Sequence, residues 1–455
     1  MTDPHTDHRH AQRAHDEAPE ETAGGADPAH GPRVLLGVAG GIAAYKACHL
    51  VREFSEHGAD VTVVPTPNAL KFVGAATFEA LSGNPVATDV FTGVDEVRHV
   101  RVGQESDLVV IAPATADLIA RLAAGRADDL LTASVLVATC PVVVAPAMHT
   151  EMWLNPATRD NVATLRRRGI TVLDPASGRL TGPDSGPGRL LEPAQIAELA
   201  RTAAARGGLS RPLEGTTVLI SAGGTREGLD PVRYLGNRSS GRQGFALAEV
   251  AGQLGARVEL VAGATDALPT PANTTVTRIE STAELKAAVD ERAPRADVVI
   301  MAAAVSDFRP ASVAGAKMKK GSEAEAGLET LQMAENPDIL RGVVAARESG
   351  ALGGDTVIVG FAAETGDEDA DALEYGRRKL LKKGCDVILC NEVGQGRAFG
   401  TPDNAGWLLT APEGATDPAD VTVREVPRGS KQEIAAEILA EVVRIRHADN
   451  SALQD

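Results

Sequence analysis

Two segments of this chain share one pattern, in which a β-branched apolar strand runs into a small-residue turn and then a helix. The first is VLLGVAGGIAAYK at 34–46, and the second opens with TVLISAGGT at 217–225. Small residues let a backbone approach a phosphate, and the helix N-terminus that follows favours an anion. Neither segment matches the dinucleotide fingerprint G-x-G-x-x-G, so a standard NAD site is not expected. Two dissimilar nucleotide sites predict a bifunctional enzyme.

Short apolar strands alternate with helices throughout both halves of the chain, which predicts two α/β domains, each a mainly parallel sheet with helices on both faces. A length of 455 residues fits two cores better than one. We expect strands near 33–38, 60–65, 107–112, 141–146 and 170–173, and then near 217–221, 257–262, 276–279, 297–302, 356–361 and 386–390. We expect helices at 42–57, 67–81, 128–138, 156–168, 194–205, 243–255, 282–292, 337–347, 368–383 and 430–446, another that ends near Gly125, and a Gly/Pro-rich loop at 174–193.

The predicted boundaries follow from this pattern. A disordered tail at 1–31 precedes a first domain at 32–206, a linker at 207–212, a second domain at 213–447 and a tail at 448–455. The first tail holds five of the ten histidines, but without the ligand spacing of a metal site.

Composition excludes several classes of protein. A net charge of −17 argues against a nucleic-acid partner, which needs a basic face. No apolar run approaches the ~20 residues that cross a bilayer, and no apolar signal segment begins the chain. The four cysteines show no metal spacing, and three of them lie in or beside strand-like runs, so buried thiols are expected. We therefore expect a cytoplasmic protein that binds no membrane.

Two basic islands interrupt this acidic chain. Lys317, Lys319 and Lys320 form one, and Arg377, Arg378, Lys379, Lys382 and Lys383 form the other. Spacing alone favours solvated surface, while a bound anion is the alternative.

In the first half, polar or small residues stand where predicted strands end. Gly40 and Gly41 follow the first strand, APATAD at 112–117 follows another, and APAMHTEMW at 145–153 a third. Thr115 fits either a helix N-cap or a ligand contact. His99 follows a polar stretch, as a surface histidine commonly does.

Together these segments closely resemble the homo-oligomeric flavin-containing cysteine decarboxylase family. The resemblance implies an FMN site built from the glycine turn and the PATAD helix start, namely Gly40, Gly41, Ile42, Pro113, Ala114, Thr115 and Asp117. It implies that His99 is a base and that the segment holding Met148 and His149 binds the substrate carboxylate, with Arg189 as a further substrate contact. FMN makes decarboxylation feasible by accepting a hydride from the carbon beside sulfur, after which CO2 leaves to give an enethiolate. A neutral imidazole titrates in the range that such proton transfer needs.

Two positions depart from that family's pattern. His149 stands where the family has Asn, and it retains a hydrogen-bond donor for a carboxylate. The loop LTGPDSGPGRL at 180–190 has Gly182 where related bacterial enzymes carry the cysteine that protonates the enethiolate. Either water or another group donates that proton, or this half-reaction is impaired.

In the second half, ISAGGTREGLDPVRYLGNRSSGRQG at 220–244 is the longest specific segment. Asn237, taken alone, is more typical of a turn residue in left-handed geometry. Further strand ends carry MAAAVSDFRP at 301–310 and GFAAET at 360–365, and Lys379 and Lys383 share one helical face. Lysines that converge on strand ends indicate a triphosphate.

These segments look like the phosphopantothenate–cysteine ligase half of the bifunctional bacterial coenzyme A biosynthesis family, and the combined resemblance covers 33–446. It implies that Asn237 acts on an acyl-cytidylate and that CTP is contacted by Ala303, Asp307, Lys317, Phe361, Lys379 and Lys383. CTP activates the carboxylate because hydroxide is a poor leaving group, and the cysteine amine then displaces CMP. Mg2+ or Mn2+ is expected to be held mainly by phosphate oxygens, with no dedicated protein metal site.

The resulting expectation is a flavodoxin-like flavoprotein half and a Rossmann-like ligase half. The ligase half joins 4′-phosphopantothenate to L-cysteine with CTP, and the flavin half decarboxylates the product to 4′-phosphopantetheine. The family implies a homo-oligomer, with trimers of the flavin half and dimers of the ligase half. The alternatives are a ligase with an impaired decarboxylase half, a flavin-binding regulatory protein, and, from fold analogy alone, an NAD-dependent oxidoreductase.

Overall fold

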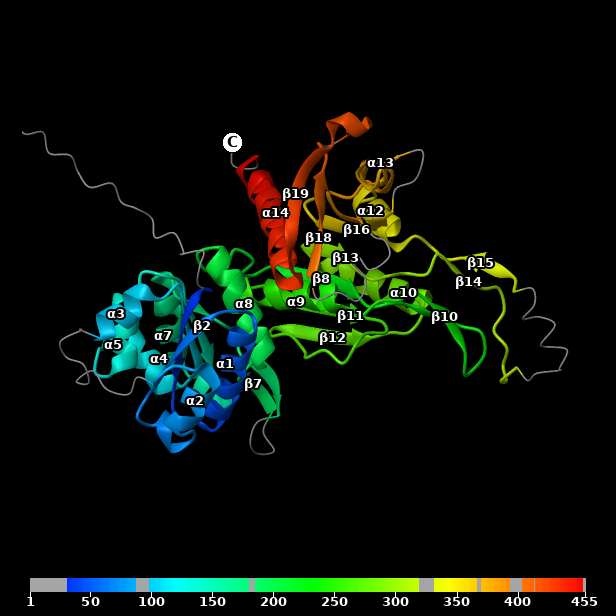
Figure 1. Ribbon diagram of the computed structural model, residues 1–455. Helices are drawn as coiled ribbons and strands as arrows, with labels where there is room; N and C mark the ends of the chain where they lie inside the picture. Colours follow the sequence, from blue (N-terminus) through cyan, green and yellow to red (C-terminus); the bar gives the residue numbers. More distant parts are fainter. Residues whose placement is uncertain are drawn as a thin grey trace, which may run out of the picture.

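The computed structural model describes residues 31–86, 98–179, 185–318, 331–365, 370–392, 403–412 and 414–452. Two sheets lie side by side, with helix α8 (Pro193–Ala205) between them (Figure 1). The predicted N-terminal tail lies almost wholly outside the described residues. No helix in the described part of the chain combines the length and apolarity needed to cross a membrane.

The first sheet has five parallel strands in the order β2-β1-β3-β4-β5. They are β1 (Arg33–Val38), β2 (Asp60–Pro65), β3 (Leu108–Ala114), β4 (Val142–Pro146) and β5 (Thr171–Val172). β3 is buried along its whole length, as a strand covered on both faces should be. Helices α1 (Lys46–Glu56), α2 (Ala75–Ser82) and α8 cover one face, while α4 (Ala116–Ala123), α5 (Leu130–Val137) and α7 (Pro156–Arg167) cover the other.

Four shorter elements lie between these strands and helices. They are the 3-10 turns η1 (Ile42–Tyr45) and η2 (Ala69–Lys71) and the helices α3 (Arg98–Glu105) and α6 (Thr150–Leu154). The predicted helix at 42–57 therefore begins as a 3-10 turn. The predicted Gly/Pro-rich loop at 174–193 was wrong in part, because Ala176–Arg179 and Ser185–Arg189 pair as the antiparallel strands β6 and β7. Strands this rich in glycine carry little propensity signal.

The second sheet has eight strands in the order β12-β11-β8-β13-β16-β17-β18-β19. The predicted parallel strands are present as β8 (Thr217–Ala222), β11 (Arg257–Ala262), β12 (Thr274–Arg278), β13 (Val298–Met301), β16 (Val357–Glu364) and β17 (Val387–Glu392). β18 (Asp403–Thr410) and β19 (Thr422–Ser430) add an antiparallel edge that the sequence reading missed. Pro427 and several charged residues interrupt the apolar pattern of β19, so the sequence does not predict a strand there. Such residues are typical of an edge strand.

Helices cover both faces of this sheet as well. α9 (Arg242–Gln253) and α14 (Lys431–Ala452) lie on one face, and α10 (Thr282–Arg292), α12 (Ile339–Glu348) and α13 (Ala372–Lys383) lie on the other. The predicted cap of α14 is confirmed, because Ser430 Oγ accepts the Glu433 N–H at 3.2 Å and Glu433 accepts the Ser430 N–H at 2.7 Å. α14 continues to Ala452, past its predicted end. The α/β class with two mainly parallel sheets is confirmed.

Further short elements accompany this sheet. They are the 3-10 turns η4 (Ala293–Arg295) and η5 (Pro418–Asp420) and the paired strands β9 (Arg226–Gly228) with β10 (Tyr234–Gly236) and β14 (Phe308–Pro310) with β15 (Met333–Glu335). These two strand pairs project together from one end of the sheet (Figure 1). Cys385 and Cys390 are buried free thiols, as expected, and burial raises their pKa to about 12 and about 11. Cys140 is only half-buried, so the expectation of a buried thiol is wrong for it.

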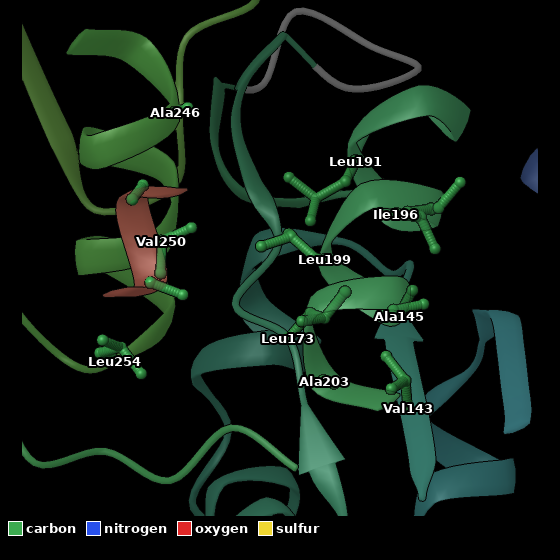
Figure 2. Close-up of a cluster of buried hydrophobic side chains, with 14 of the residues drawn as sticks. Val143, Ala145, Leu173, Leu191, Ile196, Leu199, Ala203, Ala246, Val250 and Leu254 are labelled. Atoms are coloured by element: carbon green, nitrogen blue, oxygen red, sulfur yellow. The ribbon is translucent and has the colours of Figure 1, made fainter. Parts of the chain in front are cut away.

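One apolar cluster joins the two halves. Leu191 and Leu199 of the first half belong to the same buried cluster as Ala246, Val250 and Leu254 of α9 (Figure 2). α14 also packs on α9 and on α8. The two halves therefore share an interior.

Polar side chains cross the same boundary. Gln195 of α8 donates to Glu249 of α9 at 2.6 Å, and Gln432 of α14 donates to the other carboxylate oxygen at 2.9 Å. Burial raises the pKa of Glu249 to about 7, although both amides oppose the rise. The carboxyl group thus holds three helices from both halves together.

Candidate functional sites

The first site begins at the carboxyl ends of β1 and β3. The Ala39 N–H donates to the Pro113 carbonyl at 3.0 Å, which ties the glycine turn to the PATAD segment. A Cβ on Gly40 would lie 2.5 Å from the Asn68 side chain, so only glycine fits there. A Cβ on Gly41 would meet nothing closer than Thr115 at 3.8 Å, so this residue borders open space. Gly41, Pro113, Ala114 and Thr115 are brought together as expected.

Thr115 and Asp117 begin helix α4. Thr115 Oγ1 accepts the Leu118 N–H at 3.3 Å, so Thr115 is a helix cap, and this role does not exclude a ligand contact. The Asp117 side chain is 81% exposed and lies 3.3 Å from Arg121. Its carboxylate is therefore accessible to a hydroxyl-bearing ligand at the sheet edge.

The residues around this turn fit a flavin. Ile42, Tyr45 and Phe72 are exposed apolar side chains on the elements that follow β1 and β2. An isoalloxazine ring needs apolar contact, and its phosphate needs free backbone N–H groups near small residues. The open space at Gly41 beside apolar groups provides both.

The PAMH segment follows β4 on the same edge. The Ala147 N–H donates to the Ala114 carbonyl, and the Met148 N–H donates to the Gly188 carbonyl, each at 2.9 Å. The hairpin β6–β7 is thereby fastened beside Met148. His149 is exposed at the N-terminus of α6 and makes no side-chain cap, so its imidazole is available to a ligand.

Two expectations for this site fall outside the described residues. The backbone of His99 lies in α3, which packs against α5, but its side chain is outside the description. Gly182 also lies outside the described residues. Arg189 ends β7, and its guanidinium lies 3.8 Å from Glu192.

The second site lies at the carboxyl ends of β8 and β13. Gly224 exchanges backbone hydrogen bonds with Ala264, and the Ala304 N–H donates to the Gly223 carbonyl at 2.8 Å. Gly223 has a φ of 80°, and a Cβ there would lie 2.5 Å from the Ala264 carbonyl oxygen. Ala303, one residue earlier, donates its N–H to Ser221 Oγ at 3.1 Å. The small residues therefore form a close junction of two strand ends.

Asn237 is fixed across this junction. Its Nδ2 donates to the Val305 carbonyl at 2.9 Å, two residues from Asp307. It is not among the described residues with a positive φ, so the left-handed turn interpretation is wrong. Asp307 is exposed, and its carbonyl accepts the Asn336 N–H at 2.8 Å. The structure thus brings Asn237, Ala303 and Asp307 to one edge.

Asp230 supports the second site from behind, a role that the sequence reading missed. Its carboxylate accepts the Val232 and Arg233 N–H groups at 2.8 Å each and the Met318 N–H at 3.2 Å. Burial opposes the charge, but the bonds from Arg233 and these backbone groups hold the pKa of Asp230 well below its usual range. Asp230 therefore anchors the segment that carries Lys317. The Asp-Pro turn at 230–231 was the available signal.

Two of the three lysines of α13, Lys379 and Lys383, are paired with carboxylates. Lys379 Nζ lies 3.0 Å from Glu364 at the end of β16, and Lys383 pairs with Asp338 at the start of α12. Burial opposes ionisation of Asp338, but Lys383 and the Arg341 N–H lower its pKa. Phe361 lies half-buried on the same strand as Glu364. These lysines do not form a free solvated face, so that interpretation is wrong for them.

No group of three or more metal-ligating side chains occurs among the described residues. A divalent cation that arrives with a nucleotide would therefore draw most of its ligands from phosphate oxygens and water.

Two protein-family models match this chain. Residues 213–445 match the model of the DNA/pantothenate metabolism flavoprotein C-terminal domain, and residues 26–204 match the flavoprotein model. The coenzyme A biosynthesis bifunctional protein CoaBC of Mycolicibacterium smegmatis is 57% identical over 408 residues, which cover 90% of this chain and 96% of that protein. This chain belongs to the CoaBC family.

More distant CoaBC proteins also match. That of Vibrio vulnificus strain YJ016 is 42% identical over 415 residues, covering 90% of this chain and 97% of its own length. A crystal structure of a CoaBC C-terminal domain matches with 32% identity and a TM-score of 0.41, covering 52% of this chain and 99% of that one. Within the CoaBC family the flavoprotein domain is the decarboxylase half and the other domain is the ligase half, so each edge described above belongs to one half.

Proposed function

We propose that this enzyme joins 4′-phosphopantothenate to L-cysteine with CTP and then decarboxylates 4′-phosphopantothenoylcysteine to 4′-phosphopantetheine. The observation that carries the proposal is the presence of two distinct glycine-lined strand edges in a chain that spans 96% of a bifunctional CoaBC relative. The two reactions are consecutive because the product of the ligase edge is the substrate of the flavin edge.

In the ligase half, Lys317, Lys379 and Lys383 neutralise the triphosphate as charge shifts onto pyrophosphate. Glu364 and Asp338 hold two of these lysines until CTP displaces the pairs. Asn237, fixed by the Val305 carbonyl, presents its amide to the acyl-cytidylate. Ala303, Asp307 and Phe361 surround the cytidine.

In the decarboxylase half, the turn at Gly40, Gly41 and Ile42 and the PATAD residues Pro113, Ala114, Thr115 and Asp117 hold FMN, which when bound supplies the hydride acceptor that a saturated carbon lacks. His99 takes a proton from the substrate at this edge. Met148 and His149 orient the substrate carboxylate, with His149 donating a hydrogen bond in place of the family asparagine.

A ligase with an impaired decarboxylase half is the second candidate, because Gly182 removes the thiol that would protonate the enethiolate. Under the first proposal, water or another group donates that proton.

The proposal also covers the oligomeric state of the protein and its location in the cell. Exposed Ile42, Tyr45 and Phe72 beside the FMN turn support contact between flavin halves, in trimers. Exposed Val232, Tyr234, Leu235, Phe308 and Met333 on the projecting strand pairs support dimers of the ligase half. A net charge of −17 supports an enzyme without a nucleic-acid partner. The same proposal places it in the cytoplasm, without a membrane partner. Mg2+ or Mn2+ accompanies CTP.

One experiment tests the proposal. Purified holoenzyme receives 4′-phosphopantothenate, cysteine and CTP, and the product is identified by mass. 4′-Phosphopantetheine is the expected product. Accumulation of 4′-phosphopantothenoylcysteine would establish the second candidate instead, and equal activity with ATP would contradict the nucleotide assignment.

A further inference from the structure

A cavity of about 400 Å³ lies where the first half, the linker and the second half meet. α6 and α7 contribute one wall, the segment after β5 and the hairpin strand β7 contribute another, and the ligase half closes it. Its principal lining side chains are Trp153, Arg159, Asp174, Pro187, Arg211 and Arg257.

The cavity lies on the same sheet edge as the decarboxylase site. Asp174 follows β5 and Met148 follows β4, and these neighbouring parallel strands are about 4.8 Å apart. Pro187 immediately precedes Gly188, whose carbonyl accepts the Met148 N–H at 2.9 Å. Trp153 is about one helical turn beyond His149 on α6. A molecule bound at Met148 and His149 therefore has this cavity as its neighbour.

The negative charge of the one carboxylate that lines the described cavity, Asp174, is neutralised by neighbouring arginines. Asp174 accepts bonds from Arg166 at 3.0 Å, from Arg211 at 2.7 Å and from Asn273 at 2.8 Å. Burial opposes its ionisation, but the two arginines hold the pKa of Asp174 below its usual range. Asp174 thus leaves no charge of its own for a ligand cation.

Two further guanidinium groups remain for an anion. Arg159 lies over the Trp153 ring at 5.8 Å, and Arg257 is exposed at the start of β11. Within the described ranges, neither Arg159 nor Arg257 forms an ion pair with a carboxylate. Arg211 adds a buried Nε that has no hydrogen-bond partner in the described part of the chain. The cavity therefore has a net positive charge and a hydrogen-bond donor, Arg211 Nε, that is available to a ligand.

We propose that this cavity binds the phosphate end of the decarboxylase substrate, so that the ligase half supplies Arg257 to the decarboxylation site. The inference rests on the proposed function, in which the substrate carries a carboxylate at one end and a phosphate at the other. Extended, its chain is about as long as four residues, or ~14 Å, which exceeds one strand spacing and one helical turn. Arginine suits a phosphate because its planar fork donates two parallel hydrogen bonds.

The test compares Arg257→Gln holoenzyme with wild type in CO2 release from 4′-phosphopantothenoylcysteine and from its dephosphorylated analogue. We expect KM for the phosphorylated substrate to rise about tenfold with kcat nearly unchanged, as loss of one charged hydrogen bond predicts. The analogue should show no change. Arg159→Gln should behave alike, and the double variant should lose more than either.

Arg295→Gln is the matched control, because it removes an exposed arginine of the same half outside the cavity. Titration calorimetry with 4′-phosphopantetheine and with pantetheine gives a second readout, in which only the phosphorylated ligand should bind Arg257→Gln more weakly. An equal change for both substrates, no change, or a raised KM for 4′-phosphopantothenate in ligation would overturn the proposal. Wild type that releases no CO2 would instead remove the proposed decarboxylase function.

Discussion

At the scale of single residues, buried carboxylates organise both sites indirectly. Asp230 contacts no expected ligand, yet it joins the turn at 230–233 to Met318, and Arg233 also donates to the Met318 carbonyl at 2.9 Å. The position of Lys317 therefore depends on a charge that contacts the neighbouring Met318 but lies far away in the sequence.

Asp230→Asn should weaken CTP binding. The amide keeps the shape of the side chain but cannot accept from Arg233 and three backbone N–H groups at once, so the Lys317 segment loses its anchor. We expect KM for CTP to rise severalfold in the ligase assay, with CO2 release unchanged. Asp290→Asn, which removes a surface carboxylate from α10, serves as the control; an equal rise there would contradict the anchoring role.

The lysines of α13 give a second prediction at this scale. Lys383→Gln should lower the affinity for CTP about tenfold, because it removes a charge-assisted bond to the triphosphate. Lys382→Gln changes the neighbouring residue, which is exposed, and should leave affinity within twofold. Equilibrium titration with CTP measures both variants, and similar losses in the two would mean that only the overall charge of the helix matters.

At the scale of elements, the hairpin β6–β7 contacts the PAMH segment through Gly188. Gly188 has a φ of 141°, and a Cβ there would lie 2.4 Å from the Met148 carbonyl oxygen. The hairpin can therefore reach the PAMH segment only through a residue without a side chain. This close contact explains why a segment with so few strand-forming residues still pairs.

Gly188→Ala should separate the hairpin from Met148 and reduce CO2 release at least tenfold, since substrate positioning at this edge would be lost. The ligase reaction should persist. Gly125→Ala is the control, because Gly125 also has a positive φ but a Cβ there meets nothing within 4 Å. If Gly125→Ala abolished CO2 release equally, backbone strain rather than the contact with Met148 would be responsible.

The sequence predicted the parallel strands and their helices well, because they are buried apolar runs that end in glycine or proline turns. It did not predict β18 and β19, since Gly406 and Pro427 interrupt strands that are stabilised by pairing at the sheet edge. Gly41 and Thr115 were correctly predicted to lie at one site, because both follow the carboxyl ends of neighbouring parallel strands. The partners of Lys379 and Lys383 were not predictable, because Glu364 and Asp338 lie on other elements and only the folded chain brings them near.

At the scale of the whole molecule, the boundary between the halves contains a carboxyl group that titrates near neutral pH. Glu249 is buried among α8, α9 and α14, and its pKa of about 7 exceeds the ordinary value of 4.5. The folded chain therefore keeps a proton on this carboxyl that the unfolded chain has released between these two values. Stability should fall as pH rises through this window and level off above pH 7.

Glu249→Gln should abolish most of this dependence. Wild type is expected to lose roughly 1.4 kcal/mol of stability per pH unit within the window on account of this group. The variant should be less sensitive, as measured by urea unfolding midpoints from pH 5 to pH 8. Glu348→Gln, an exposed change on α12, should retain the wild-type dependence, and a Glu249→Gln profile that matched wild type would contradict the assignment.

The apolar cluster shared by α8, α9 and α14 has a consequence for the timing of the two reactions. Side chains packed across the boundary keep both halves in one arrangement, so the intermediate moves while its two binding edges stay in place. The intermediate then moves by diffusion of a small molecule between two fixed sites. Diffusion of a small molecule over such a path is much faster than an enzymatic turnover, so the lag before CO2 appears should depend on the rate constants of the two sites and should not change with solvent viscosity.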